Sequence, residues 1–269
     1  MGMATGLSIT VARCCGNADG MKIRKAVAAS LVIALIFTLI LTVGAYIVLH
    51  PLLRLLHTPE EVYPLAYDYL VPVILFLFVT MAYNLFAGFL RAVGNSIAPL
   101  IFLVISSCLN VGLDILFIVP LGMGAKGAAI ATVAAQAVAS VICVFYIFRR
   151  ARQLIPGRKD FVPAREIYRE AAFQGVSMSL MNGIIYAGGA ILQIAINGMG
   201  TLIVAAHTAA RRIYSIFLTP FGAINATVST FVSQNRGADQ PDRIRQGVRI
   251  AYLGYCHDDV DLLRLSART

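Results

Sequence analysis

Charged residues are scarce in this chain, and their scarcity excludes an ordinary soluble domain. Only 13% of the 269 residues are Asp, Glu, Lys or Arg, whereas 59% are hydrophobic and the mean hydropathy is +0.79. Soluble globular domains carry about 25% charged residues. The composition therefore predicts a protein that lies in a lipid bilayer.

Patterns for metal, redox or hydrolytic chemistry are also missing from the sequence. The five cysteines include no CxxC pair, and the four histidines form no HExxH motif. Zinc and redox sites require such spacings. The sequence has no GxSxG elbow and no paired intramembrane aspartates either, so we expect no bound metal, no cofactor and no enzymatic activity.

Basic residues outnumber acidic ones, 22 to 13, which gives a formal net charge of +9. They occur in short runs between apolar segments rather than on one face with interleaved aromatics, which argues against nucleic-acid binding. Basic and charge-poor loops alternate along the chain, as expected when Lys and Arg gather on the cytoplasmic side. Segment 149–169 holds seven basic residues and turn 197–201 none, so we predict a multi-pass protein of the cytoplasmic membrane.

Six apolar runs are long enough to cross a bilayer, which takes about 20 helical residues. They are apolar all round rather than along one stripe, which is typical of helices surrounded by lipid. The sequence thus predicts an all-α, polytopic membrane helix bundle. The expected spans are 26–49, 63–90, 97–119, 127–148, 171–198 and 202–233.

An internal repeat relates the two halves of this bundle. The stretch SITVARCCGNADGMKIRKAV from Ser8 aligns without gaps on STFVSQNRGADQPDRIRQGV from Ser229, at an offset of 221 residues. Six predicted crossings separate the copies, an even number, so both copies have the same orientation. That is the parallel type of transporter repeat, which predicts parallel six-helix lobes. The identical pairs are Ser8/Ser229, Val11/Val232, Gly16/Gly237, Ile23/Ile244, Arg24/Arg245 and Val27/Val248.

The repeat also indicates domain boundaries. Residues 1–150 are expected to form a nearly complete N-terminal lobe, with a partial first helix and four complete helices. Residues 151–170 form a basic cytoplasmic linker, and residues 171–252 begin a partial C-terminal lobe. Residues 253–269 form a polar tail where the repeat predicts an apolar helix, so we expect a truncation or a change of reading frame there, and a missing helix before residue 1.

One acidic residue lies deep inside a predicted span. Asp114 interrupts the apolar run LNVGLDILFIVP, and Ser107 and Asn110 share its helix face. A charged carboxylate in a bilayer costs a few kcal/mol and usually faces a cavity or a partner. Asp114 is therefore a candidate functional residue.

The next span carries a second polar stripe, in which Thr132, Gln136 and Ser140 recur every four residues. Two facing stripes would supply carboxylate, amide and hydroxyl oxygens. Such groups suit a proton on Asp114 or a hard cation such as Na⁺. The alternative is a hydrogen-bonded cluster that only fixes helix packing.

Further polar side chains are candidates to line a substrate cavity. They are Gln136, then Tyr186, Gln193 and Asn197 on one face of span 171–198, and His207 and Arg211 on the following span. Polar contacts that only pack helices are an equally good interpretation. Arg211 and the adjacent Arg212 need a partner or water, because a charge this far into a span is costly.

Four segments of the sequence resemble multidrug and toxic compound extrusion (MATE) transporters, over about residues 4 to 250. They are FAGFLRAVGNSIAPL, LNVGLDILFIVPLGMGAKGAAIAT, LQIAINGMGTLIVAAHTAARRI and STFVSQNRGA. The resemblance implies a twelve-helix, two-lobe antiporter that exports small organic, often cationic, compounds in exchange for H⁺ or Na⁺, working as a monomer in the bilayer. It also implies that Asn110, Asp114 and Thr132 form the coupling site.

Two other interpretations stay open at this point. The chain is a nonfunctional truncated or frameshifted fragment of such a transporter, or it belongs to a lipid-linked precursor flippase of the same superfamily. A flippase should have a more basic central cavity, for which Arg211 and Arg212 speak.

Overall fold

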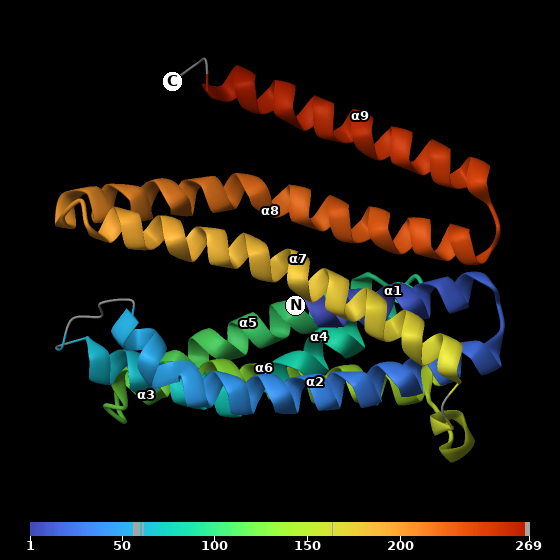
Figure 1. Cartoon of the computed structure of the whole chain (residues 1–269), viewed down its shortest axis with the longest axis horizontal. Coiled ribbons are helices and arrows are strands. Elements are labelled where there is room, and N and C mark those ends of the chain that lie inside the picture. Colours follow the sequence, from blue (N-terminus) through green and yellow to red (C-terminus); the bar gives the residue numbers. More distant parts are fainter. Residues whose placement is uncertain (56–59, 61, 163, 267–269) are drawn as a thin grey trace. The chain divides into compact units, whose positions relative to one another are not determined.

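The computed structural model describes residues 1–55, 60, 62–162 and 164–266, with side chains described as far as residue 253 except Thr201 and Pro220. Every regular element in this described part is helical, which confirms the all-α prediction (Figure 1). The elements are α1 (Gly2–Gly16), α2 (Gly20–Leu55), α3 (Tyr63–Leu75), α4 (Leu77–Ala92), α5 (Ile97–Ile118), α6 (Gly124–Arg150), η1 (Arg152–Leu154), η2 (Arg158–Phe161), α7 (Arg165–Asn197), α8 (Thr201–Gly237) and α9 (Pro241–Ser266). The expected polar tail lies outside the described side chains except at Leu253.

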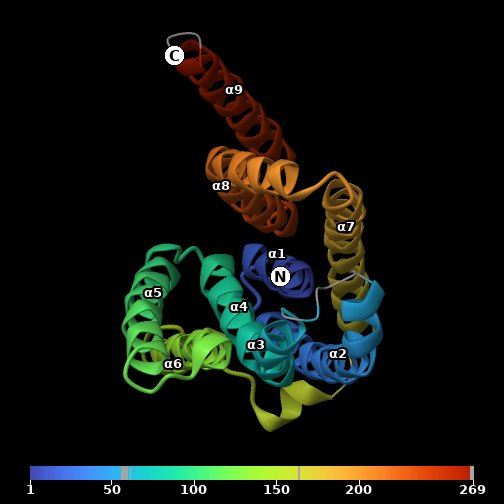
Figure 2. The ribbon, with the colours of Figure 1, turned by 90° about the vertical axis from the view of Figure 1, so that its left-hand side faces the viewer.

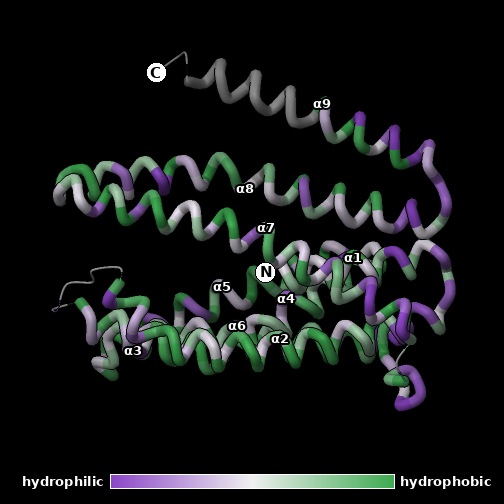
Figure 3. Tube along the Cα trace, in the orientation of Figure 1, coloured by the Kyte–Doolittle hydropathy of each residue, from purple (hydrophilic) through white to green (hydrophobic). Residues whose placement is uncertain are grey.

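Among the described helices, α2, α5, α6, α7 and α8 are each long and apolar enough to cross a membrane, and the bent pair α3–α4 reaches that length and hydropathy when its two helices are taken together. Hydrophobic residues run along these helices (Figure 3). Large apolar side chains lie on their outer faces, such as Leu39 and Ile47, which are 66% and 68% exposed. Lipid is the solvent that suits such a surface, so the chain is a multi-pass membrane protein.

The expected span over 63–90 consists of two helices, because α3 and α4 meet at a bend of 52°. Phe76 leaves helical geometry at φ −103° and ψ 21°, and its N–H donates to the Pro72 carbonyl at 3.0 Å. Pro72, one turn earlier, has no N–H to donate and weakens the helix locally. Hydropathy does not reveal the bend, since both halves are apolar.

The structure reproduces the internal repeat. Helix α1 ends at Gly16 and α8 ends at the equivalent Gly237, and the following helices begin at the equivalent residues Gly20 and Pro241. Each turn contains a non-glycine residue in the left-handed region, with φ 53° at Ala18 and 52° at its equivalent Asp239. Few non-glycine residues adopt this conformation, so its occurrence at both equivalent positions confirms that the two copies share one turn structure.

The same backbone hydrogen bonds close both turns. Asn17 N–H donates to the Arg13 carbonyl at 3.4 Å, and at the equivalent positions Ala238 N–H donates to the Gln234 carbonyl at 2.9 Å. A second bond follows in each copy, from Ala18 to Cys15 at 3.0 Å and from Asp239 to Arg236 at 3.4 Å. The sequence repeat is therefore a structural repeat.

The chain divides into two compact units: Met1–Val11 with Gly20–Ser179, and Ala12–Asp19 with Leu180–Thr269. In the first unit α6 packs against α3, α4 and α5 (Figure 2). The buried face of α6 carries small residues at every fourth position, which let neighbouring helices approach closely. They are Gly127, Ala131, Ala135, Ala139 and Cys143.

The basic linker is ordered in this first unit rather than extended. Its turns η1 and η2 pack against α2, and Leu154 is buried. The Asp160 carboxylate accepts a bond from the Gly157 N–H at 2.8 Å and pairs with Arg24 of α2 at 3.3 Å. Asp160 therefore fastens the linker to the start of a membrane helix.

Candidate functional site

Two glycine-dependent turns set the position of α5 relative to α4 and α6. Before α5, Gly94 has φ +87°, and the Asn95 side chain accepts from Ala98 N–H at 3.1 Å and donates to Tyr146 of α6 at 2.9 Å. After α5, Gly122 and Gly124 have φ +61° and +54°, values that favour glycine. These turns place the polar face of α5 beside α6.

Asn110 of α5 and Thr132 of α6 meet as the sequence predicts. The Asn110 Nδ2 donates to the Thr132 hydroxyl at 3.4 Å, and this hydroxyl donates to the Ala128 carbonyl of its own helix at 3.0 Å. Asp114 lies one turn beyond Asn110 and is half-buried. Its Oδ1 atom is shielded from solvent and has no hydrogen-bond partner among the described residues.

A shielded carboxylate oxygen without a donor is uncommon, because buried polar groups are nearly always paired. A proton or a cation on Asp114 would remove the unmet charge. Carboxylate, amide and hydroxyl oxygens are ligands that hard cations prefer. In the described part of the chain, no cluster of three or more His, Cys, Asp or Glu residues provides a site for a transition metal.

Gln136 of α6 belongs to the same unit as Asp114, but its side chain forms a hydrogen bond with α4 rather than α5. It accepts a hydrogen bond of 2.5 Å from the Thr80 hydroxyl of α4, and the Asn84 side chain donates to the Thr80 carbonyl at 2.7 Å. Thr80 and Asn84 are not among the residues predicted from the sequence, although their spacing of four places them on one helix face. The other two stripe residues differ in burial, since Ser107 is exposed and Ser140 is 9% exposed.

The remaining cavity candidates belong to the second unit. Gln193 donates to Asn197 at 2.9 Å along α7, and Tyr186 is 67% exposed on the same helix. On α8, the Nε2 atom of His207 is shielded from solvent and has no partner in the described chain. Arg211 lies one turn further, and a Cβ added at Gly189 of α7 would be 3.3 Å from its Nη2 atom.

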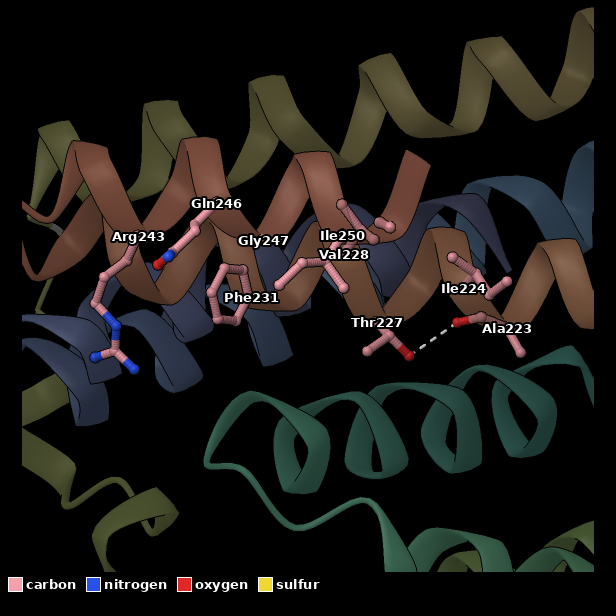
Figure 4. A pocket seen from close by; sticks show the side chains of 10 residues that line it. Ala223, Ile224, Thr227, Val228, Phe231, Arg243, Gln246, Gly247 and Ile250 are labelled. Atoms are coloured by element: carbon pink, nitrogen blue, oxygen red, sulfur yellow. Dashed lines mark hydrogen bonds between the residues drawn. The ribbon is translucent and has the colours of Figure 1, made fainter. Parts of the chain in front are cut away.

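A groove of about 560 Å³ lies between α8 and α9 in the second unit (Figure 4). It is mostly apolar, and the Thr227 hydroxyl within it is bonded to the Ala223 carbonyl of its own helix at 2.9 Å. Arg243 and Gln246 supply its other polar groups. None of the residues predicted from the sequence lines this groove, so it is not the predicted site.

The helices, the repeat and the intramembrane carboxylate together define a class: polytopic membrane proteins built from parallel repeats, as in secondary transporters. The chain belongs to the MatE family, whose model matches residues 1–116 and 177–254. Membership confirms both the resemblance seen in the sequence and the expectation that the protein is not an enzyme.

Curated relatives carry transporter or resistance names. "Probable multidrug resistance protein YpnP" of Bacillus subtilis (strain 168) is 32% identical over 72% of this chain and 43% of the relative. The "FAD transporter" of Shewanella oneidensis is 26% identical over 93% of this chain and 56% of the relative. The chain thus spans about half the length of the relatives that it matches.

Solved structures agree with this fold. A crystal structure of MATE in the bent conformation superposes with a TM-score of 0.86 at 25% identity, covering 98% of this chain and 59% of that one. A MOP superfamily transporter from Pyrococcus furiosus, whose title describes a binding pocket of reverse polarity, superposes with a TM-score of 0.83 at 25% identity, covering 97% and 59%.

Proposed function

We propose that this chain is part of a cation-coupled antiporter that exports organic compounds across the cytoplasmic membrane in exchange for H⁺ or Na⁺. Asp114 carries the coupling ion, and Asn110 and Thr132 position it. Family membership supports the transport of organic compounds as the activity.

The single observation that carries this proposal is the shielded Oδ1 atom of Asp114, which has no partner in the described residues. A carboxylate in this setting is costly when ionised and tolerable when it holds a proton or a cation. The energetic difference between the loaded and the empty site is what a coupling site requires.

The charge state of Asp114 can then couple ion binding to the conformation of the transporter. With the ion bound, Asp114 is neutralised and the helices can close around it. Once the ion leaves, the carboxylate needs water or a new partner, which favours a conformation open to one side. An ion gradient can shift this equilibrium only because the two conformations bind the ion with different affinity.

The test is Asp114→Asn in the complete open reading frame, including any coding sequence that flanks residues 1–269. Asparagine keeps the size of the side chain and cannot carry the negative charge. We expect drug resistance to fall to the level of cells without the gene, while the amount of protein in the membrane stays the same. Resistance is measured by growth with a panel of cationic, neutral and anionic dyes and drugs, and protein by immunoblot of membranes.

Asp68→Asn is the matched control, because it removes an acidic side chain that lies exposed on α3. Resistance should be unchanged in this variant. Full resistance of Asp114→Asn at equal protein level would show that Asp114 does not couple transport. Absence of resistance in the parent protein with every compound tested would overturn the export function itself.

A further inference from the structure

The helical hairpin of α7 and α8 has an unusual charge composition. From Ala171 to Ala238 the sequence contains no Asp and no Glu, and its basic residues are Arg211, Arg212 and Arg236. Arg236 lies in the last turn of α8, next to the turn whose basic residues predict a cytoplasmic location. Arg211 and Arg212 therefore stand apart as charges inside a predicted membrane span.

Their depth follows from helix geometry. Helix α8 begins at Thr201, and Arg211 comes ten positions later. At about 1.5 Å of rise per residue the Arg211 backbone is about 15 Å along the helix, about half of a hydrocarbon core of about 30 Å. Guanidinium groups at that depth require an anionic partner or water.

The surroundings of Arg211 place a second donor beside it. His207 is one turn earlier on the same helix face, and its Nε2 atom is shielded and unpartnered within the described residues. The Arg211 guanidinium lies against Gly189 of α7, where a Cβ would be 3.3 Å from Nη2. Since Gly189 has no side chain, the guanidinium can lie close to the backbone of α7.

No ion pair of Arg211 or Arg212 with a carboxylate occurs in the part of the chain that the structure describes. Among the second unit's residues with described side chains, the acidic ones are Asp19, Asp239 and Asp242, which lie in or next to the two turns of the repeat. The charge of the hairpin is thus not neutralised from within it. An incoming ligand is a natural source of the missing negative charge.

We propose that His207 and Arg211, with the positive charge of the adjacent Arg212, form a site for the anionic group, a carboxylate or a phosphate, of the compound that the transporter carries. This inference rests on the export activity proposed above and assigns organic anions to its substrate class. Arginine suits this role because its planar fork donates two parallel hydrogen bonds to a carboxylate or phosphate. Between Ala171 and Ala238 a cationic compound would instead meet like charges and no carboxylate.

The experiment compares the uptake of an anionic and a cationic probe by inverted membrane vesicles. The vesicles contain the protein that the complete open reading frame encodes. Carboxyfluorescein is the anionic probe and ethidium the cationic one, and uptake is recorded with an imposed ion gradient. We expect Arg211→Gln to raise the half-saturating concentration of carboxyfluorescein at least about tenfold, the scale of one lost charge-assisted hydrogen bond. Ethidium uptake, where present, should change less than about twofold.

Two variants separate binding from structural effects. Arg236→Gln removes the same charge from the exposed end of the same helix and should leave both uptakes unchanged. Arg211→Lys keeps the charge and should restore part of the carboxyfluorescein affinity. Equal loss of both probes in Arg211→Gln, or unchanged carboxyfluorescein uptake, would overturn the anion site.

A comparison of lipids shows whether the anionic group belongs to a transported compound or to a lipid headgroup. For this comparison the purified protein is reconstituted into vesicles of defined lipid. An arginine-dependent uptake that persists in vesicles of phosphatidylcholine supports a transported anion as the ligand. If the dependence appears only with phosphatidylglycerol, the anionic group belongs to a lipid headgroup, and the substrate assignment fails. Ethidium transport without any carboxyfluorescein transport in the parent protein refutes this inference and leaves the export function intact, whereas transport of neither probe together with no drug resistance refutes the export function.

Discussion

Asp114, Asn110 and Thr132 form the candidate coupling site through short-range helix geometry. Positions 110 and 114 are one turn apart, so their side chains share a face of α5, and Thr132 faces them from α6 through the bond of 3.4 Å from Asn110. The sequence predicted this group because each residue is polar in an apolar run. It did not predict Thr80 as the partner of Gln136, since that bond joins helices 56 positions apart.

At this residue scale the Thr132 hydroxyl can be tested on its own. Thr132→Val keeps the shape and removes the acceptor for Asn110, a bond worth about 0.6 kcal/mol on average within membranes. We expect the concentration of coupling ion that half-activates transport to rise about two- to threefold, which corresponds to that energy. Thr132→Ser should restore the parent value, measured as ion-dependent uptake in vesicles.

Thr38→Val is the matched control for this change. The Thr38 hydroxyl donates only to the Ala34 carbonyl of its own helix, at 2.7 Å. Its removal should leave ion activation unaltered. The same shift in both variants would mean that the effect comes from helix packing and not from the site.

The ends of α1 and α8 cross with their backbones in contact. A Cβ on Gly16 would overlap the Gln234 carbonyl oxygen, and a Cβ on Gly237 would overlap the Arg13 carbonyl oxygen. Gly16 is equivalent to Gly237 in the repeat, and Arg13 to Gln234, so the crossing is self-complementary in the manner of a two-fold interface. Small residues at such crossings allow helices to pack in a membrane without a hydrophobic driving force.

This crossing predicts opposite effects of one substitution at two places on α8. Gly237→Ala forces a methyl group into a backbone contact and should destabilise the protein by about 1–3 kcal/mol. Gly222 has no atom within 4 Å of its would-be Cβ, so Gly222→Ala should stabilise by about 0.5–1 kcal/mol. The chain has no tryptophan, so thermal unfolding in detergent is best followed by circular dichroism at helical wavelengths. Equal stability of the two variants would contradict the close backbone contact of α1 and α8 at Gly237.

On the scale of the whole molecule, an ion pair joins the linker between the predicted lobes to α2. Arg24 and Asp160 are 3.3 Å apart, with side-chain exposures of 40% and 12%, and Asp160 also accepts from Gly157. In the other copy of the repeat, Arg245 pairs instead with Asp242, at 3.6 Å and almost fully exposed. The partly buried pair should matter more, since exposed pairs contribute little.

We therefore expect Asp160→Asn to speed trypsin cleavage after Arg158 and Lys159 several-fold, because asparagine no longer attracts Arg24 and the linker detaches more often. Asp242→Asn should leave the cleavage rate of the linker unchanged. Both rates are measured by gel and mass spectrometry on the purified protein in detergent. Identical linker cleavage in the parent and in Asp160→Asn would refute the fastening role.

The sequence by itself determined the membrane environment, the apolar spans, the repeat and the place of Asp114 in α5, because hydropathy, helix period and residue spacing are local properties of the chain. Only the tertiary structure decided the bend at Phe76, the bond from Thr80 to Gln136, the glycine crossing of α1 and α8 and the attachment of the linker through Asp160. These features depend on which helices lie side by side, and packing between distant segments leaves no periodic signal in a run of uniformly apolar residues.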